Sequence, residues 1–303
     1  MSLRPFRLLP SFREKIWGAT ALEPWFRNPT VKIGEVWFSA DDNLAEDGRT
    51  LGALVRDDGP ALLGRGQDAD GFPILVKFLF TTDRLSLQVH PNDEQARAAG
   101  GGPGKTEMWY ILRAEPASTL ALGFKEPIAR ERLFESAIGG EIEGLVRWVP
   151  VRAGDTFFTP AGVVHAIGTG IALVEIQQNS DITYRLYDYG RPRELHLEKG
   201  VPIADLGPCP GPSITVDAGA GRRELARCEH FAAESIEWTS PIAYEPDASR
   251  MDILVFLEGS GSLDGRPFGP GEVWVVPASA APFPIGIDAP VRLLRTYVPP
   301  RGA

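Results

Sequence analysis

Two stretches of this chain follow one pattern, and that repeat limits the folds open to it. GDTFFTP at 154–160 reads as glycine, acid, strand and proline, and GEVWVVP at 271–277 reads the same way. Upstream, residues 110–114 match 255–259, because each is an apolar run that ends at a small residue. Two copies of one strand-rich unit predict a mainly β chain built from two similar units in tandem.

The rest of the chain has the same short-strand character. Proline and glycine are plentiful, at 27 and 33 residues, which favours many short strands joined by tight turns. Strands are predicted where β-branched or aromatic runs are bounded by Gly, Pro or Asp: 31–38, 72–80, 108–112, 171–177, 251–257 and 273–276. Short helices are predicted at 91–99 and 127–137, each opened by proline and followed by glycines. Residues 1–30 and 42–71 read as irregular or helical, and both alternatives stay open.

A linker separates the two copies. GPCPGP at 207–212 is rich in proline and glycine, as linkers between domains often are. The interval from Ala114 to Gly154 is 40 positions and that from Gly259 to Gly271 is 12, so the first copy carries about 28 additional residues. We therefore predict one domain at 1–206 and a second at 207–303.

Three short segments supply side chains that bind divalent metals. Gln88 and His90 lie in SLQVHP, Glu107 lies in KTEMWY, and His165 lies in PAGVVH. Together they offer an amide oxygen, two imidazoles and a carboxylate, a donor set for one transition metal. A lone histidine is most often structural, but Gln88 two positions before His90 and the turn around His165 favour a metal site.

Several motifs resemble those of a known family. The turn pattern G-x5-P-x-G-x2-H, from 154 to 165, resembles the second motif of the cupin superfamily. Further segments are similar to those of the type I phosphomannose isomerases: KIWG at 15–18, SLQVHP at 86–91, GKTEMWY at 104–110 and VEIQQNSDITYR at 174–185. The 58 positions between Glu107 and His165 are too few for the large helical domain of longer members, so the resemblance is to a short form.

This resemblance implies two tandem cupin-like jelly-roll barrels with a few short helices. It implies one divalent metal, zinc above all, bound by Gln88, His90, Glu107 and His165, with Gln88 the least typical ligand. The implied reaction is the interconversion of mannose 6-phosphate and fructose 6-phosphate, by proton transfer through an enediolate. The resemblance covers residues 1–195 well and the remainder loosely.

Charged and polar residues near these ligands complete the candidate site. They are the catalytic candidates Arg185, Lys105 and Glu175, and the substrate-binding candidates Ser86, Lys105, Asp181 and Arg185. Lys105 lies two residues before Glu107, so on a strand both side chains share one face. Ser86 alternates with Gln88 in the same way. The sequence assigns no general base.

The second copy lacks the metal-binding residues. A metal-binding copy needs glycine at 279 and histidine at 282, where this chain has Ser279 and Pro282. Asp252 matches Glu107 in position, but no histidine accompanies it. We therefore predict that the second unit is a degenerate cupin domain without metal.

The composition of the chain limits the kinds of partner and the cellular location that we expect. The net charge of −9 argues against nucleic acid. No run approaches the roughly 18 apolar residues that cross a membrane, and the first residues lack the apolar stretch of a signal peptide. Cys209 and Cys228 are too few for a disulfide framework. We expect a cytoplasmic enzyme that acts on a small sugar phosphate, as a monomer or a homodimer.

Two other functions stay open at this point. One is another metal-dependent cupin enzyme, such as an isomerase for a different sugar phosphate or a dioxygenase; a dioxygenase normally has more histidine ligands than this chain offers. The other is a non-catalytic sugar-binding protein on the same scaffold, which is favoured if Arg185, Lys105 and Glu175 point away from the metal. Arg185 is alternatively a structural partner of Asp181 or Asp188.

Overall fold

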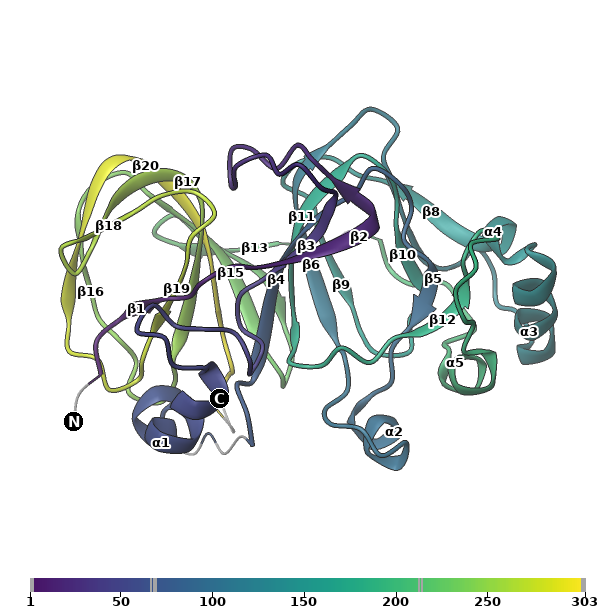
Figure 1. Ribbon diagram of the computed structural model, residues 1–303, viewed down its shortest axis with the longest axis horizontal. Coiled ribbons are helices and arrows are strands. Elements are labelled where there is room, and N and C mark those ends of the chain that lie inside the picture. The colour runs from purple at the N-terminus through teal and green to yellow at the C-terminus, as the bar shows by residue number, and fades with distance from the viewer. Residues whose placement is uncertain (1–2, 66, 68–69, 212, 214, 301–303) are drawn as a thin grey trace.

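The computed structural model describes residues 3–65, 67, 70–211, 213 and 215–300. Across these residues antiparallel strands dominate, and they form two β-rich units that lie side by side (Figure 1). The N-terminal unit holds a six-stranded and a five-stranded sheet, and the C-terminal unit holds a nine-stranded sheet. The predicted mainly β fold is confirmed. The division into two complete jelly-roll barrels stays a prediction.

The six-stranded sheet of the N-terminal unit contains two long strands that are buried along their whole length. The strand order of that sheet is β2 (Ser11–Ala19), β3 (Ile33–Trp37), β4 (Ile74–Phe80), β11 (Ile171–Gln178), β6 (Glu107–Ala114) and β9 (Thr156–Thr159). The five-stranded sheet has the order β12 (Tyr184–Tyr187), β5 (Leu87–Val89), β10 (His165–Ile167), β7 (Thr119–Phe124) and β8 (Val146–Pro150). Every residue of β4 and β11 is buried, so one lysine and one glutamate within them are unusual.

The C-terminal unit also includes the first strand of the chain. Its main path runs β1 (Phe6–Arg7), β19 (Val273–Val276), β17 (Asp252–Leu263), β20 (Phe283–Tyr297), β15 (Ala232–Trp238), β14 (Arg222–Arg227) and β13 (Val216–Gly219). Off this path, β16 (Ile242–Tyr244) pairs with β20 and β18 (Arg266–Phe268) pairs with β17.

Short helices flank the sheets. They are α1 (Leu51–Leu63), α2 (Asp93–Ala98), α3 (Arg130–Gly139), α4 (Ile142–Leu145) and α5 (Leu197–Ile203). The helices predicted at 91–99 and 127–137 are confirmed as α2 and α3. Within the described ranges, no helix is long and apolar enough to span a membrane. The first 30 residues, read as irregular or helical, instead contain β1 and β2, because alternate residues of β2 face inward as in a strand.

The sequence repeat has the same pairing in both units. Glu107 on β6 stands opposite Thr159 on β9, and Asp252 on β17 stands opposite Val276 on β19. The glycine that opens each copy has a positive φ, 89° in the first and 82° in the second. Glycine adopts that conformation without strain, which explains why both copies begin with it. Glu107 and Asp252 therefore occupy equivalent positions.

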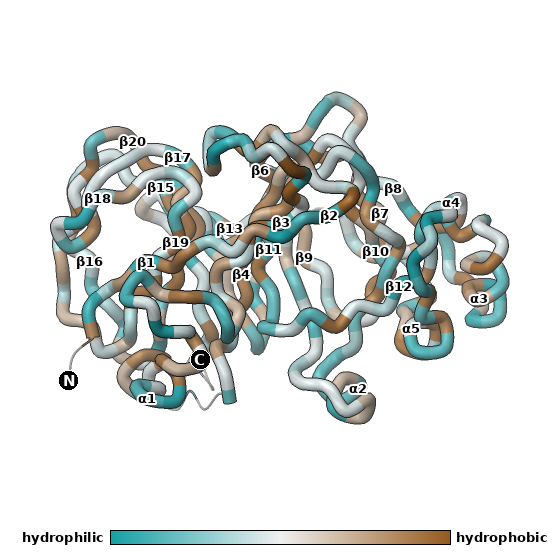
Figure 2. Tube along the Cα trace, viewed as in Figure 1, coloured by the Kyte–Doolittle hydropathy of each residue, from teal (hydrophilic) through white to brown (hydrophobic). Residues whose placement is uncertain are grey.

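The two units share part of their core. Phe6 of β1 pairs with Val275 of β19, so the start of the chain joins the C-terminal sheet. One hydrophobic cluster contains both Phe78 of β4 and Ile253 of β17. Hydrophobic residues gather on the strands and on α1, whereas the outer loops are mostly hydrophilic (Figure 2). The domain boundary at 206 stays a proposal. β1 precedes that boundary in the sequence but pairs with a strand of the C-terminal unit.

Candidate metal centre and active site

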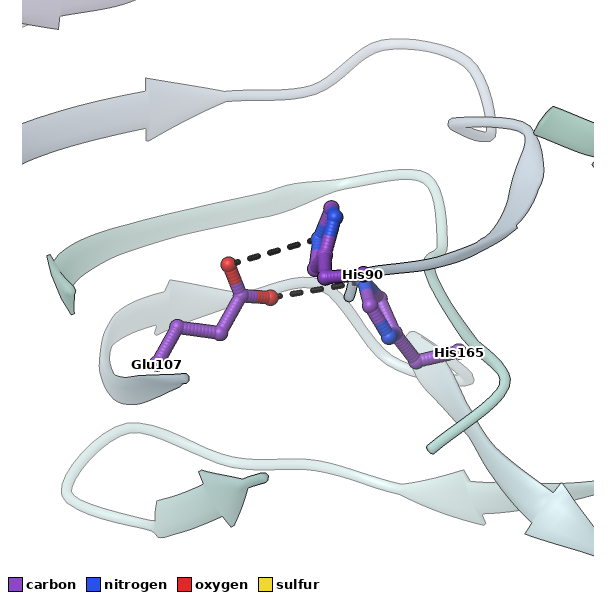
Figure 3. A group of neighbouring side chains, drawn as sticks. All are labelled: His90, Glu107 and His165. Carbon is purple, nitrogen blue, oxygen red and sulfur yellow. Dashed lines mark ion pairs between the residues drawn. The ribbon is translucent and has the colours of Figure 1, made fainter. Parts of the chain in front are cut away.

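Three buried side chains of the N-terminal unit converge on one point. His90 follows β5, Glu107 opens β6 and His165 opens β10. Glu107 Oε2 lies 3.6 Å from His90 Nε2, and Glu107 Oε1 lies 3.3 Å from His165 Nε2 (Figure 3). One ligand atom from each residue lies within 4.8 Å of the others. We call these three residues the metal trio.

Both histidines present an unprotonated nitrogen to the centre. His90 Nδ1 donates to Ile182 O at 2.8 Å, and His165 Nδ1 donates to Val163 O at 2.9 Å. A backbone carbonyl only accepts, so Nδ1 carries the proton in both rings and Nε2 keeps its lone pair. Burial lowers the pKa of His165 to about 4 and lowers the pKa of His90 well below its usual value. Both imidazoles are therefore neutral near pH 7, as metal ligands must be.

Glu107 is a buried carboxylate that attracts a cation. Among the described residues, neither of its oxygens accepts a hydrogen bond of good geometry. The Lys105 ammonium lies 2.9 Å from Glu107 Oε2 and 3.1 Å from His90 Nε2. Burial raises the pKa of Glu107 to about 7, although Lys105 opposes that rise. Lys105 is the partner of Oε2, but Oε1 faces the unprotonated Nε2 of His165 at 3.3 Å with no hydrogen between them, so a divalent metal between these atoms fits the residues.

Gln88 and Ser86 lie beside the metal trio. Gln88 stands opposite His165 in the pairing of β5 with β10, which puts both side chains on one face. Gln88 Nε2 lies 3.3 Å from His165 Nε2, and Ser86 Oγ donates to Gln88 Oε1 at 3.3 Å. In this orientation Gln88 turns its amide nitrogen, not its oxygen, toward the imidazole. Its assignment as a fourth ligand stays a proposal.

A second buried ion pair joins β4 and β11 of the six-stranded sheet, which also carries Glu107 on β6. Lys77 Nζ lies 3.2 Å from Glu175 Oε1, and Trp109 Nε1 donates to Glu175 Oε2 at 3.0 Å. The Lys77 ammonium also lies 4.5 Å from the centre of the Trp37 ring, a cation–π contact. Burial alone would raise the pKa of Glu175, but Lys105 and Lys77 lower it to about 2. The sheet therefore holds Glu175 as a stable carboxylate.

Lys77 was missed in the sequence. It is 1% exposed and lies in the middle of the apolar run ILVKFLF. A lysine inside a strand that is buried on both faces needs a partner, and that signal could have identified it. Its partner Glu175 is 98 positions away, and only the pairing of β4 with β11 brings the two together.

Arg185 and Asp181 lie at the margin of this group. Arg185 on β12 stands opposite Gln88 on β5, so it shares the face that carries His165. Its Nη1 donates to Glu194 O at 2.7 Å, and its buried Nε has no partner within the described part of the chain. The Asp181 side chain is 70% exposed and lies 4.0 Å from Lys77 Nζ.

The structure does not contain the ion pair of Arg185 with Asp181 or Asp188 that the sequence left open. Asp188 is held instead by Arg191 at 2.7 Å and by Arg193 at 2.6 Å. Arg185 forms no ion pair with Asp181 or Asp188. The structure thus places Lys105 in contact with the metal trio. The Nε donor of Arg185 has no partner within the described residues.

Known proteins resemble the chain along most of its length, although no protein-family model matches it. It is 39% identical to the mannose-6-phosphate isomerase ManA of Bacillus subtilis over 225 residues, which are 69% of this chain and 71% of that protein. It is 32% identical to the putative mannose-6-phosphate isomerase YvyI of the same organism over 309 residues, 94% and 96% of the two chains. The crystal structure of mannose 6-phosphate isomerase from Bacillus subtilis matches with a TM-score of 0.87 at 29% identity, covering 97% of this chain and 99% of that one. The chain belongs to the mannose-6-phosphate isomerase family.

Proposed function

We propose that this protein interconverts mannose 6-phosphate and fructose 6-phosphate, the activity for which its relatives are named. The observation that carries the proposal is the buried metal trio with a lysine ammonium against it. Aldose–ketose isomerisation moves a proton between neighbouring carbons, and an enediolate with negative charge forms on the way. A water-poor site with fixed positive charge stabilises such an intermediate.

One divalent metal fits the site. The donors are nitrogen and oxygen without a thiolate, which suits a catalytic zinc. We propose that His90, Glu107 and His165 hold it and that Gln88 completes the set after its amide turns. When bound, such an ion polarises the oxygen atoms of a substrate and stabilises negative charge on them.

The charges around the site suit an anionic substrate once a metal is present. Lys77 and Lys105 balance Glu107 and Glu175 when both carboxyls are ionised, and the two imidazoles are neutral. A divalent cation then gives this buried group a net positive charge. A sugar phosphate is complementary to it, although the whole chain carries −9.

The lysines and Glu175 take different roles in this proposal. Burial alone would lower the pKa of Lys105, but Glu107 and Glu175 outweigh it and raise that pKa, so the ammonium stays charged beside the substrate. A carboxyl with a pKa of about 2 is a weak base, so we assign Glu175 to holding Lys77 rather than to accepting a proton.

Arg185, Ser86 and Asp181 are the proposed substrate contacts. The unpartnered Nε of Arg185 is a donor available to a phosphate or sugar oxygen. Ser86 is buried beside Gln88, and the exposed Asp181 lies toward solvent. We further propose that residues 1–206 form the catalytic domain, and that 207–303 form a second domain without metal.

A coupled assay that follows fructose 6-phosphate formed from mannose 6-phosphate tests this function. We expect turnover by the zinc-loaded protein, loss of turnover with a chelator, and recovery when zinc is returned. Turnover of a different aldose phosphate alone would favour another isomerase. Binding of mannose 6-phosphate without turnover would favour a sugar-binding protein. Either result would contradict the proposal.

A further inference from the structure

The side chains of Asp93 and Gln178, which lie outside β6, form hydrogen bonds with the segment that leads into this strand. Gly104 N donates to Asp93 Oδ1 at 2.7 Å, and Thr106 N donates to Gln178 Oε1 at 2.9 Å. Gln178 Nε2 in turn donates to Asp93 Oδ1 at 2.8 Å, so the two side chains are joined. The backbone amides on both sides of Lys105 are thus fixed by one linked pair.

We propose that Asp93 and Gln178 form a clamp that positions Lys105 and Glu107 for the metal and the substrate. Within the described residues, neither clamp residue forms a hydrogen bond or an ion pair with the metal trio, so both are positioning residues. The Lys105 ammonium contacts both His90 and Glu107, and therefore a shift of its backbone disturbs the ligand set and the nearby positive charge together. The effect on turnover rests on the proposed function, whereas the effect on metal binding does not.

Local structure places each part of the clamp. Asp93 is the first residue of α2, whose start is fixed by a capping box between Asn92 and Gln95. Gly104 passes so close to this helix that a Cβ there would lie 2.5 Å from Asn92 C and 2.6 Å from Asp93 N. Only glycine allows that approach.

The other half of the clamp comes from the sheet. Gln178 is the last residue of β11, and its neighbour Gln177 stands opposite Glu107 on β6. Gln178 N also donates to Thr106 O at 3.1 Å, so backbone and side chain hold the same residue. Groups one layer behind a metal ligand typically change metal affinity or activity by about 10- to 100-fold when removed.

The chemistry of the clamp suggests matched variants. Both hydrogen bonds to Asp93 reach the same atom, Oδ1, so Asp93→Asn keeps an acceptor there and Asp93→Ala removes it. Gln178→Glu has the same shape but replaces the donor that faces Asp93 with an oxygen. Asn92→Ala removes the cap of the same helix and leaves the hydrogen bonds to 104 and 106 in place.

The test is zinc affinity, measured by competition with a chromophoric chelator well below the melting temperature of each full-length variant, together with kcat and KM. We expect Asp93→Ala and Gln178→Glu to weaken zinc binding by about tenfold or more and to lower kcat with little change in KM. Asp93→Asn should restore both, and Asn92→Ala should lower only the melting temperature.

Three results would overturn the clamp. They are wild-type zinc affinity in Gln178→Glu, a loss in Asp93→Asn as large as that in Asp93→Ala, and an equal loss in Asn92→Ala. If Asp93→Ala fails to fold, the zinc affinity of Gln178→Glu still tests the clamp. If the wild type binds zinc but turns over no mannose 6-phosphate, the proposed function fails, and the affinity comparison still decides the clamp.

Discussion

Glu107 and Asp252 occupy the same position in the two units, yet their surroundings differ. Glu107 faces two imidazoles and the Lys105 ammonium, and its Oε1 accepts no hydrogen bond within the described residues. Asp252 is equally buried, but Tyr244 Oη donates to its Oδ2 at 2.6 Å and Arg250 Nε donates to its Oδ1 at 3.3 Å. One oxygen of the Glu107 carboxylate, Oε1, has no hydrogen-bond donor within the described residues, whereas both oxygens of Asp252 accept one.

Arginine supplies the positive charge in the C-terminal unit. Arg295 forms an ion pair with Glu234 at 2.5 Å and lies 4.0 Å from Asp252. A buried carboxylate needs a positive partner in either unit. The comparison teaches that the repeat keeps the place of the acid, while the neighbouring side chains decide what faces it: two imidazoles and an ammonium at Glu107, and a tyrosine hydroxyl and guanidinium groups at Asp252.

The largest expected difference between the units is in turnover. Glu107→Ala removes a proposed metal ligand, so we expect kcat/KM to fall on the order of 10³-fold. Asp252→Ala should keep turnover near the wild-type level at a temperature where it stays folded, because that residue belongs to the other unit. The coupled assay checks both variants, and similar losses in the two would remove the distinction between the units.

The stability of the C-terminal unit should depend on Asp252 more than on an exposed acid of the same unit. Asp252→Ala removes a buried carboxylate that accepts from Tyr244 and from the half-buried Arg250, and leaving such partners without an acceptor costs about 1–3 kcal/mol of unfolding free energy. Glu237→Ala, which removes an exposed partner of Arg292, should cost less than about 1 kcal/mol. Urea unfolding of the two variants measures the gap. A loss for Asp252→Ala as small as that of the control would mean that the buried network contributes little.

Acid should weaken the ion pair between Lys77 and Glu175 in the N-terminal unit. The pKa of Glu175 is lowered to about 2, so its ionised form stabilises the fold above about pH 4.5, and this stability is lost as the pH falls toward 2. The contribution is about 3 kcal/mol. Unfolding free energies of wild type and Glu175→Gln should therefore converge on acidification. Parallel curves would show that the carboxylate is not stabilised by its lysines.

Zinc should stabilise one unit more than the other. At a hundredfold excess over its Kd, a ligand adds about 2.7 kcal/mol to the stability of the form that binds it. We expect hydrogen exchange to slow in β6 and β10, which carry Glu107 and His165, and to change less in β17 and β19. Equal protection of all four strands would contradict a metal confined to the N-terminal unit.

Local patterns in the sequence predicted the metal trio but not its whole surroundings. The spacing of SLQVHP, KTEMWY and PAGVVH was enough to indicate His90, Glu107 and His165, because each motif fixes its own turn or strand. Lys77 lies in no such motif, and Gln178 lies in VEIQQNSDITYR, where nothing distinguishes its role from that of Gln177. Their roles arise from the pairing of β4, β11 and β6, which short-range patterns do not encode.

For the fold as well, the sequence predicted features formed by neighbouring residues but not contacts between residues far apart in the chain. The repeat predicted the equivalence of Glu107 and Asp252, because the glycine turn and the strand after it are local. The pairing of Phe6 with Val275 joins residues 269 positions apart, and no pattern near residue 6 indicates it. The guanidinium of Arg185 is directed by the carbonyl of Glu194, nine positions along the chain and outside the motif at 174–185.

The central claim is that one metal binds this chain, in the N-terminal unit only. Elemental analysis of protein loaded with zinc and then dialysed tests it most directly. We predict one zinc per chain in the wild type and in Asp252→Ala, and none in Glu107→Ala. Two zinc ions per wild-type chain, or one retained in Glu107→Ala, would contradict the account.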